Sequence, residues 1–114
     1  MKVVRGRLQD IMDAITQIEK HSARGRAAFD ESEMIQVWMV HHLRIIGEAV
    51  RAIEPAFRDR HPSVPWRDVA GMRSVLVHDY GNINLNIVWS PVEKDVPLLK
   101  EQIRKLLAEM PEDK

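Results

Sequence analysis

The sequence predicts an all-α protein, an up-and-down bundle of four main helices and a short fifth, formed by one domain over residues 1–114. Three observations lead to this fold class. Apolar residues recur three and four positions apart over long segments, which is the spacing of a buried helix face. Glycine is scarce, at 5 of 114 residues, which disfavours a strand-and-turn architecture. A chain of this length can bury a core as a single domain without disulfides.

Composition and charge exclude several classes of protein. Cysteine is absent, which excludes disulfides and thiolate metal sites and suits a reducing compartment. Charges interrupt the first residues, so no signal-peptide core is expected there, and no apolar run reaches the length of a membrane span. We therefore expect a cytoplasmic protein. Seventeen basic and seventeen acidic residues cancel, which argues against nonspecific coating of nucleic acid. Residues 58–78 nevertheless carry four basic and two acidic groups, which leaves room for a local phosphate-binding patch.

The first two helices are predicted over residues 3–21 and from about residue 32 to 53. The first has one apolar stripe, and Gly25 marks the loop that follows it. Asp30 or Ser32 can cap the second helix, which stops before Pro55. Two apolar stripes on the second helix predict a central position, packed against the rest of its own chain, with a second chain as a candidate further neighbour. Gly47 within it suggests a close helix–helix approach, and Glu48 beside it then needs a partner.

The second half of the chain is predicted to form a short helical piece near Phe57 and two further helices. One helix runs from Trp66 to about Tyr80, with Pro65 at its start, where the missing N–H is harmless. The last runs over residues 85–110, and prolines inside its apolar pattern predict a kink or a break.

Residues 73–80, Arg-Ser-Val-Leu-Val-His-Asp-Tyr, combine a cation, an acid–base group and apolar packing. Arg73 falls in the apolar stripe of its helix, so it needs a carboxylate, a phosphate or a solvent-filled cleft beside it. Five residues place Arg73 and His78 about 140° apart on a straight helix. A loop that turns His78 round, or a second subunit in a two-fold dimer, could bring both to one target.

Such a pair could cleave RNA without a metal or cofactor. Histidine near its ordinary pKa can take a proton from a ribose 2′-hydroxyl or give one to the leaving oxygen. Arginine stabilises charge that develops on phosphoryl oxygens. Glu48, Ser74 and Asp79 are candidate supporting residues. The alternative is a structural arginine–carboxylate pair followed by a histidine that ends the helix.

The motif at residues 73–80 matches the Arg, four residues, His, one residue, Tyr motif of HEPN-domain proteins, and most resembles the HepT branch. Similarity extends to residues 43–49, which contain Ile-Gly-Glu-Ala, to residues 65–80, and to residues 84–103. Two departures are Arg44, where the family often has Glu, and Pro91 in the last helix. They put partner contacts and the geometry of that helix in doubt more than the chemistry.

This resemblance implies a homodimeric toxin with metal-independent endoribonuclease activity, in which Arg73 and His78 line a cleft between subunits. It also implies an MNT-type nucleotidyltransferase antitoxin that neutralises the toxin by transferring AMP to Tyr80. The competing hypothesis is a non-catalytic helical adaptor that binds the nucleotidyltransferase or a nucleotide. A metal site at His41 and His42 is not expected, because adjacent helix positions diverge by about 100° and no second ligand pair is evident.

Overall fold

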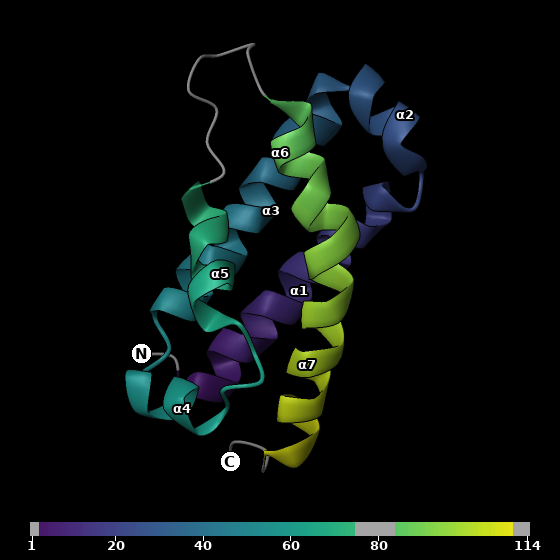
Figure 1. The fold of residues 1–114 in the computed structure, drawn as a ribbon. Helices are drawn as coiled ribbons and strands as arrows, with labels where there is room; N and C mark the ends of the chain where they lie inside the picture. Colours follow the sequence, from purple (N-terminus) through teal and green to yellow (C-terminus); the bar gives the residue numbers. More distant parts are fainter. Residues whose placement is uncertain (1–2, 75–83, 111–114) are drawn as a thin grey trace.

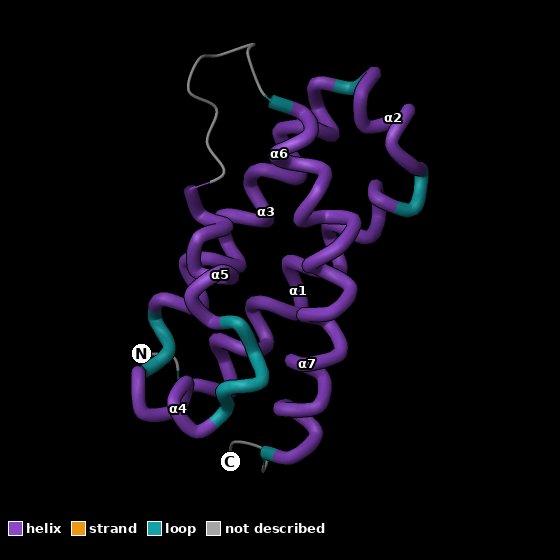
Figure 2. Tube along the Cα trace, in the orientation of Figure 1, coloured by secondary structure: helices purple, strands orange, loops and turns teal. Residues whose placement is uncertain are grey.

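The computed structural model describes residues 3–74 and 84–110, and every element within them is helical (Figure 2). The three long helices are α1 (Val4–Ser22), α3 (Glu33–Arg51) and α7 (Val96–Glu109). The short helices are α2 (Gly25–Glu31), α4 (Pro55–Arg60), α5 (Trp66–Ala70) and α6 (Leu85–Ser90). A 3₁₀ segment, η1 (Gly71–Ser74), follows α5, and a π-helical segment, η2 (Pro91–Asp95), joins α6 to α7. The predicted all-α bundle is therefore confirmed.

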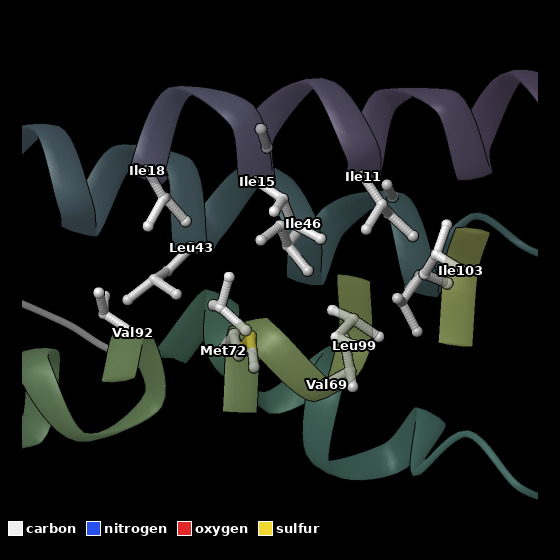
Figure 3. Close-up of a cluster of buried hydrophobic side chains, with 14 of the residues drawn as sticks. Ile11, Ile15, Ile18, Leu43, Ile46, Val69, Met72, Val92, Leu99 and Ile103 are labelled. Carbon is white, nitrogen blue, oxygen red and sulfur yellow. The ribbon is translucent and has the colours of Figure 1, made fainter. Parts of the chain in front are cut away.

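The core lies where α1, α3 and the C-terminal helices meet (Figure 1). The apolar stripe of α1 is fully buried, as its spacing predicts; its members are Leu8, Ile11, Ile15 and Ile18. In Figure 3 these isoleucines face Leu43 and Ile46 of α3, while side chains from α5, η1 and α7 close the cluster from the other side. Within the described residues, no helix is long and apolar enough to cross a membrane.

The two apolar stripes predicted on α3 differ in how deeply they are buried. Members of one stripe pack into the core, and these are Ile35, Met39, Leu43, Ile46 and Val50. The other stripe begins with Met34, which is 67% exposed, and continues through the partly buried Trp38 and Ile45. At the start of the helix, the Ser32 hydroxyl accepts a hydrogen bond from the Ile35 amide, as expected for a cap. One apolar stripe of α3 therefore remains partly open to solvent in the single chain.

The segment between α1 and α3 contains a helix that the periodicity does not predict. Gly25 opens α2 with φ of +88°, a conformation that favours glycine. This turn reverses the chain and allows Phe29 to reach the core, where it is fully buried and packs against Trp89 at 5.2 Å between ring centroids. A helix of this length has too few apolar positions to show a period, so its formation depends on that packing.

The C-terminal segment shows a kink, the first of the two predicted alternatives, as a change of helix type without a non-helical residue. Pro91 lacks the N–H that would continue the hydrogen-bond ladder of α6, and η2 begins at that residue. Pro97 lies in the first turn of α7, where no partner for an N–H is needed. Val92 and Val96 remain buried through the change of helix type. The π-helical segment therefore keeps the apolar face of α6 in line with that of α7.

Candidate functional site

Arg73 is positioned by the packing of η1 against α3. Gly47 is buried at this contact, and a Cβ atom there would lie 2.6 Å from the Arg73 backbone nitrogen and 2.9 Å from the Ala70 carbonyl oxygen. Both atoms belong to the backbone, so they cannot move aside as a flexible side chain would. The absence of a side chain at Gly47 is what allows η1 to lie this close to α3. The close approach expected at this glycine is thus made by the segment that carries Arg73.

Glu48 provides a carboxylate beside Arg73. Its Oε1 atom lies 3.7 Å from a terminal guanidinium nitrogen, Nη1, and the two side chains are 62% and 41% exposed. An exposed ion pair of this length stabilises a fold by no more than about 1 kcal/mol. Its effect is therefore on the orientation of Arg73, whose guanidinium is drawn toward the exposed side of α3.

Arg73 departs from one expectation of the sequence, because it is exposed rather than part of a buried stripe. The helix changes from α to 3₁₀ at Gly71. The rotation of 100° per residue of an α-helix therefore does not apply between Gly71 and Ser74. Within the described residues, the guanidinium has the ion pair to Glu48 and no hydrogen bond. Most of its five N–H donors are open to a ligand.

Two hollows of about 850 Å³ each lie on either side of this ion pair. Glu48 lines the first, between α1 and α3, together with His41, Arg44 and Ile45. Arg73 and Ser74 line the second, which is bounded by the end of α3, by α4 and by α5. Arg73 and Glu48 therefore join two surfaces that could each receive a different molecule.

The other candidate residues are placed only in part. Ser74 follows Arg73 and is exposed at the end of η1. His78, Asp79 and Tyr80 lie outside the described residues, as does the expected end of their helix near Tyr80. Among the predicted site residues, the structure thus brings together Arg73, Glu48 and Ser74.

Comparison with known proteins identifies the family. The family model described as Ribonuclease HepT-like matches residues 11–106, which include the whole segment from Gly47 to Tyr80. The chain belongs to the HepT-like ribonuclease family. This assignment agrees with the helical fold and with an exposed arginine in the family motif. No solved structure shows a significant match to the chain.

Similar proteins occur in archaea and bacteria. “Probable ribonuclease HepT” of Thermococcus cleftensis is 35% identical over 102 residues, which cover 87% of this chain and 91% of that protein. “Gamma-glutamylcyclotransferase and putative RNase MJ0434” of Methanocaldococcus jannaschii is 32% identical over 99% of this chain. “Putative RNase TTE0752” of Caldanaerobacter subterraneus subsp. tengcongensis is 43% identical over 60% of this chain. The chain spans 51% and 61% of the lengths of the last two relatives.

Of the two adjacent histidines of this HepT-like chain, His41 and His42, the second packs inside the protein. His42 is buried, and its Nδ1 atom lies 2.8 Å from the Trp38 carbonyl oxygen. Burial has the largest effect on the His42 imidazole and lowers its pKa. The hydrogen bond to Trp38 raises the pKa, and the charges of His41 and Lys20 lower it further. His42 therefore favours the neutral form in the α1–α3 interface. The described residues contain no group of three or more His, Cys, Asp or Glu side chains that could hold a metal ion.

The sequence interpretation named a positive stretch over residues 58–78 but assigned no role to its individual arginines around the second hollow, or to Arg51. Arg51 ends α3, Arg58 lies on α4 and Arg67 lies on α5, and all three line the same hollow as Arg73. The surplus of positive charge in residues 58–78 was the available signal. Arg51 lies outside that stretch, so only the tertiary structure shows that it belongs to the same group.

Proposed function

We propose that this chain is the toxin of a HepT–MNT toxin–antitoxin pair and acts as a metal-independent endoribonuclease on cytoplasmic RNA. The observation that carries the proposal is the exposed Arg73, which is held against Gly47 beside Glu48 and precedes His78 by five positions. Such a guanidinium can bind a phosphodiester through two parallel hydrogen bonds. Membership of a ribonuclease family supports RNA as the source of that phosphodiester.

The reaction we propose is an internal transesterification. The His78 imidazole takes the proton from a ribose 2′-hydroxyl, and the 2′-oxygen attacks the adjacent phosphorus atom. The bond to the 5′-oxygen breaks, and this oxygen takes a proton from His78 of a second copy of the chain. The products are a 2′,3′-cyclic phosphate and a free 5′-hydroxyl. Arg73 stabilises the negative charge that builds on the nonbridging oxygens, so no metal ion is needed for this role.

A homodimer would bring the two histidines to one cleft. The partly open stripe of α3 supports this assembly, because Met34 and Val37 are 67% and 53% exposed. Arg44 and Glu48 follow on the exposed side of the same helix, so two antiparallel copies could pair opposite charges across a two-fold axis. The interface between the two copies would then run along α3 from the exposed apolar side chains to the Arg73–Glu48 pair.

Cleavage in the presence of a chelator tests the proposed activity. The purified chain is expected to cut single-stranded RNA in excess EDTA at the rate seen with added Mg²⁺, and its products should end in a cyclic phosphate. Gel analysis of an end-labelled RNA, with molar mass from light scattering, measures both the reaction and the dimer. Strict dependence on a divalent metal would refute the mechanism. Absence of cleavage with retained binding to the nucleotidyltransferase would favour the non-catalytic adaptor.

Modification of Tyr80 is a separate prediction. The antitoxin is proposed to transfer AMP from ATP to the Tyr80 hydroxyl with release of pyrophosphate, which adds negative charge beside His78 and repels RNA. Incubation with an MNT-type partner and ATP is expected to add one or more adenylyl groups to the intact mass. Tyr80→Phe should keep the original mass and remain an active ribonuclease. Adenylyl addition to the Tyr80→Phe protein would show that another residue is the acceptor.

A further inference from the structure

The second hollow beside Arg73 is a cationic groove, which we define by Arg51, Arg58, Arg67 and Arg73. These side chains come from four consecutive elements, α3, α4, α5 and η1. In Figure 1, α4 and α5 lie on the same side of α3, so the elements form one continuous flank of the molecule. Arg73 of the candidate site is therefore one member of a larger cationic set.

Charge distinguishes this groove from other hollows on the described surface. Its four arginines face two carboxylates, Asp59 and Asp68, which leaves a net charge of +2. The α1–α3 hollow holds two arginines and three carboxylates, for a net charge of −1. Two further hollows are lined by carboxylates and by no arginine or lysine. An anionic ligand near Arg73 is thus favoured in the cationic groove and disfavoured in the others.

Three of the four groove arginines form no ion pair within the described residues. Arg51, Arg58 and Arg67 have no carboxylate oxygen within 4.0 Å among the described residues, whereas Arg73 pairs with Glu48. The Nε atom of Arg58 is buried and has no hydrogen-bond partner. An unsatisfied buried donor is unfavourable, and a bound anion near it can remove part of that cost. These three side chains are therefore available to phosphate groups.

The lining of the groove also includes apolar side chains. Trp66 lines the groove, and its ring is held by a 2.9 Å hydrogen bond from Nε1 to the His61 carbonyl oxygen. Trp66 is only 7% exposed, so the apolar lining that is open to a ligand comes mainly from Pro55, Pro62 and Pro65. Single-stranded nucleic acids bind where cations follow the backbone and apolar or aromatic surfaces contact the sugars and bases. The groove combines both features.

We propose that the cationic groove binds the phosphodiester backbone of single-stranded RNA and leads the strand to Arg73. This inference rests on the proposed ribonuclease function and adds the path of the substrate. A single strand is favoured over a duplex, because the groove combines cations with apolar side chains, which is the combination found in single-strand binding sites. Arg51, Arg58 and Arg67 bind the substrate, and the reacting phosphate lies at Arg73.

Binding is tested in the cleavage-deficient background His78→Ala with a labelled RNA of about 12 nucleotides, within the usual site size for single strands. Arg51→Gln, Arg58→Gln and Arg67→Gln are each expected to weaken binding roughly fivefold, the effect of one exposed charge contact. The slope of log affinity against log salt should be about −2.8 for four phosphate contacts, Arg73 included, and its magnitude should fall by about 0.7 with each substitution. Arg24→Gln, an exposed arginine in the turn before α2, is the matched control and should change neither quantity.

Cleavage by the same substitutions in the active chain separates this inference from the proposed function. Each substitution should lower kcat/KM about fivefold and leave kcat unchanged, because it removes binding without touching the reacting atoms. If the unmodified chain cleaves RNA but the groove variants keep its affinity and salt slope, the groove proposal is refuted and the ribonuclease function stands. If the groove variants lose RNA binding but the unmodified chain does not cleave, the function fails and the groove stands. An equal loss with Arg24→Gln would refute the groove as a specific path. Arg51 and Arg67 are exposed, so their variants still test the proposal if Arg58→Gln does not fold.

Discussion

Replacement of His78 by alanine is expected to lower the rate of RNA cleavage by about 10²- to 10⁴-fold, the usual contribution of a positioned general acid or base. The reason is that the 2′-hydroxyl then loses its proton acceptor, while Arg73 still binds the phosphate. The loss should appear in kcat, and RNA affinity measured under non-cleaving conditions should stay within about twofold. Single-turnover cleavage of an end-labelled RNA, together with a binding titration, measures the two effects separately.

His21→Ala is the control for the loss of a histidine. His21 lies in the last turn of α1, where its ring contacts Trp38 edge-on at 5.1 Å between centroids, and it lines neither hollow beside Arg73. This variant should keep the full cleavage rate. Cleavage by His78→Ala at the rate of the unmodified chain would show that the proposed proton transfer is wrong.

Replacement of Gly47 by alanine is expected to lower cleavage by about 10²-fold, the loss caused by a displacement of roughly 1 Å in a reacting group. The new Cβ would lie 2.6 Å from the Arg73 nitrogen and 2.9 Å from the Arg73 Cβ, so η1 must move away from α3. Overpacking costs about 1–3 kcal/mol, and the higher helix propensity of alanine returns about 1 kcal/mol. The free energy of unfolding should therefore fall by no more than about 2 kcal/mol, a small effect beside the loss of activity.

Gly71→Ala is the matched control, because it makes the same chemical change at the start of η1. A Cβ at Gly71 meets no atom within 4 Å, and its backbone is already α-helical with φ of −65°. This variant should keep both its stability and its cleavage rate. Denaturant titrations and cleavage rates of the two variants provide the comparison. Equal activity in Gly47→Ala and the unmodified chain would show that the position of Arg73 does not depend on this contact.

The helices with a full apolar stripe were the most predictable part of the fold. Burial of Leu8, Ile11, Ile15 and Ile18 follows from their spacing, because residues three and four apart share one face of a helix. The kink at Pro91 was predictable for a local reason as well, since proline removes a backbone donor wherever it falls in a helix. Helix α2 was missed because its seven residues are too few to show periodicity, and its formation depends on the burial of Phe29.

The candidate site was predictable in its residue types and less so in its geometry. The sequence indicated that Arg73 needed an anionic or solvated neighbour and that Glu48 needed a partner, and the structure pairs the two. It also led us to expect one continuous α-helix from Trp66, whereas within the described residues this helix becomes 3₁₀ at Gly71. The change to a 3₁₀ helix at Gly71 involves contacts with α3, which no local pattern encodes.

By itself, the sequence determined the all-α class, the apolar faces of the long helices and the motif with Arg73, His78 and Tyr80. These features depend on the identities of residues that lie close together along the chain. Only the tertiary structure decided that Gly47 lets η1 approach α3, and that Arg51, Arg58 and Arg67 line one groove with Arg73. The physical reason is that close packing and electrostatic potential depend on distances between elements, and these distances are set when the core forms.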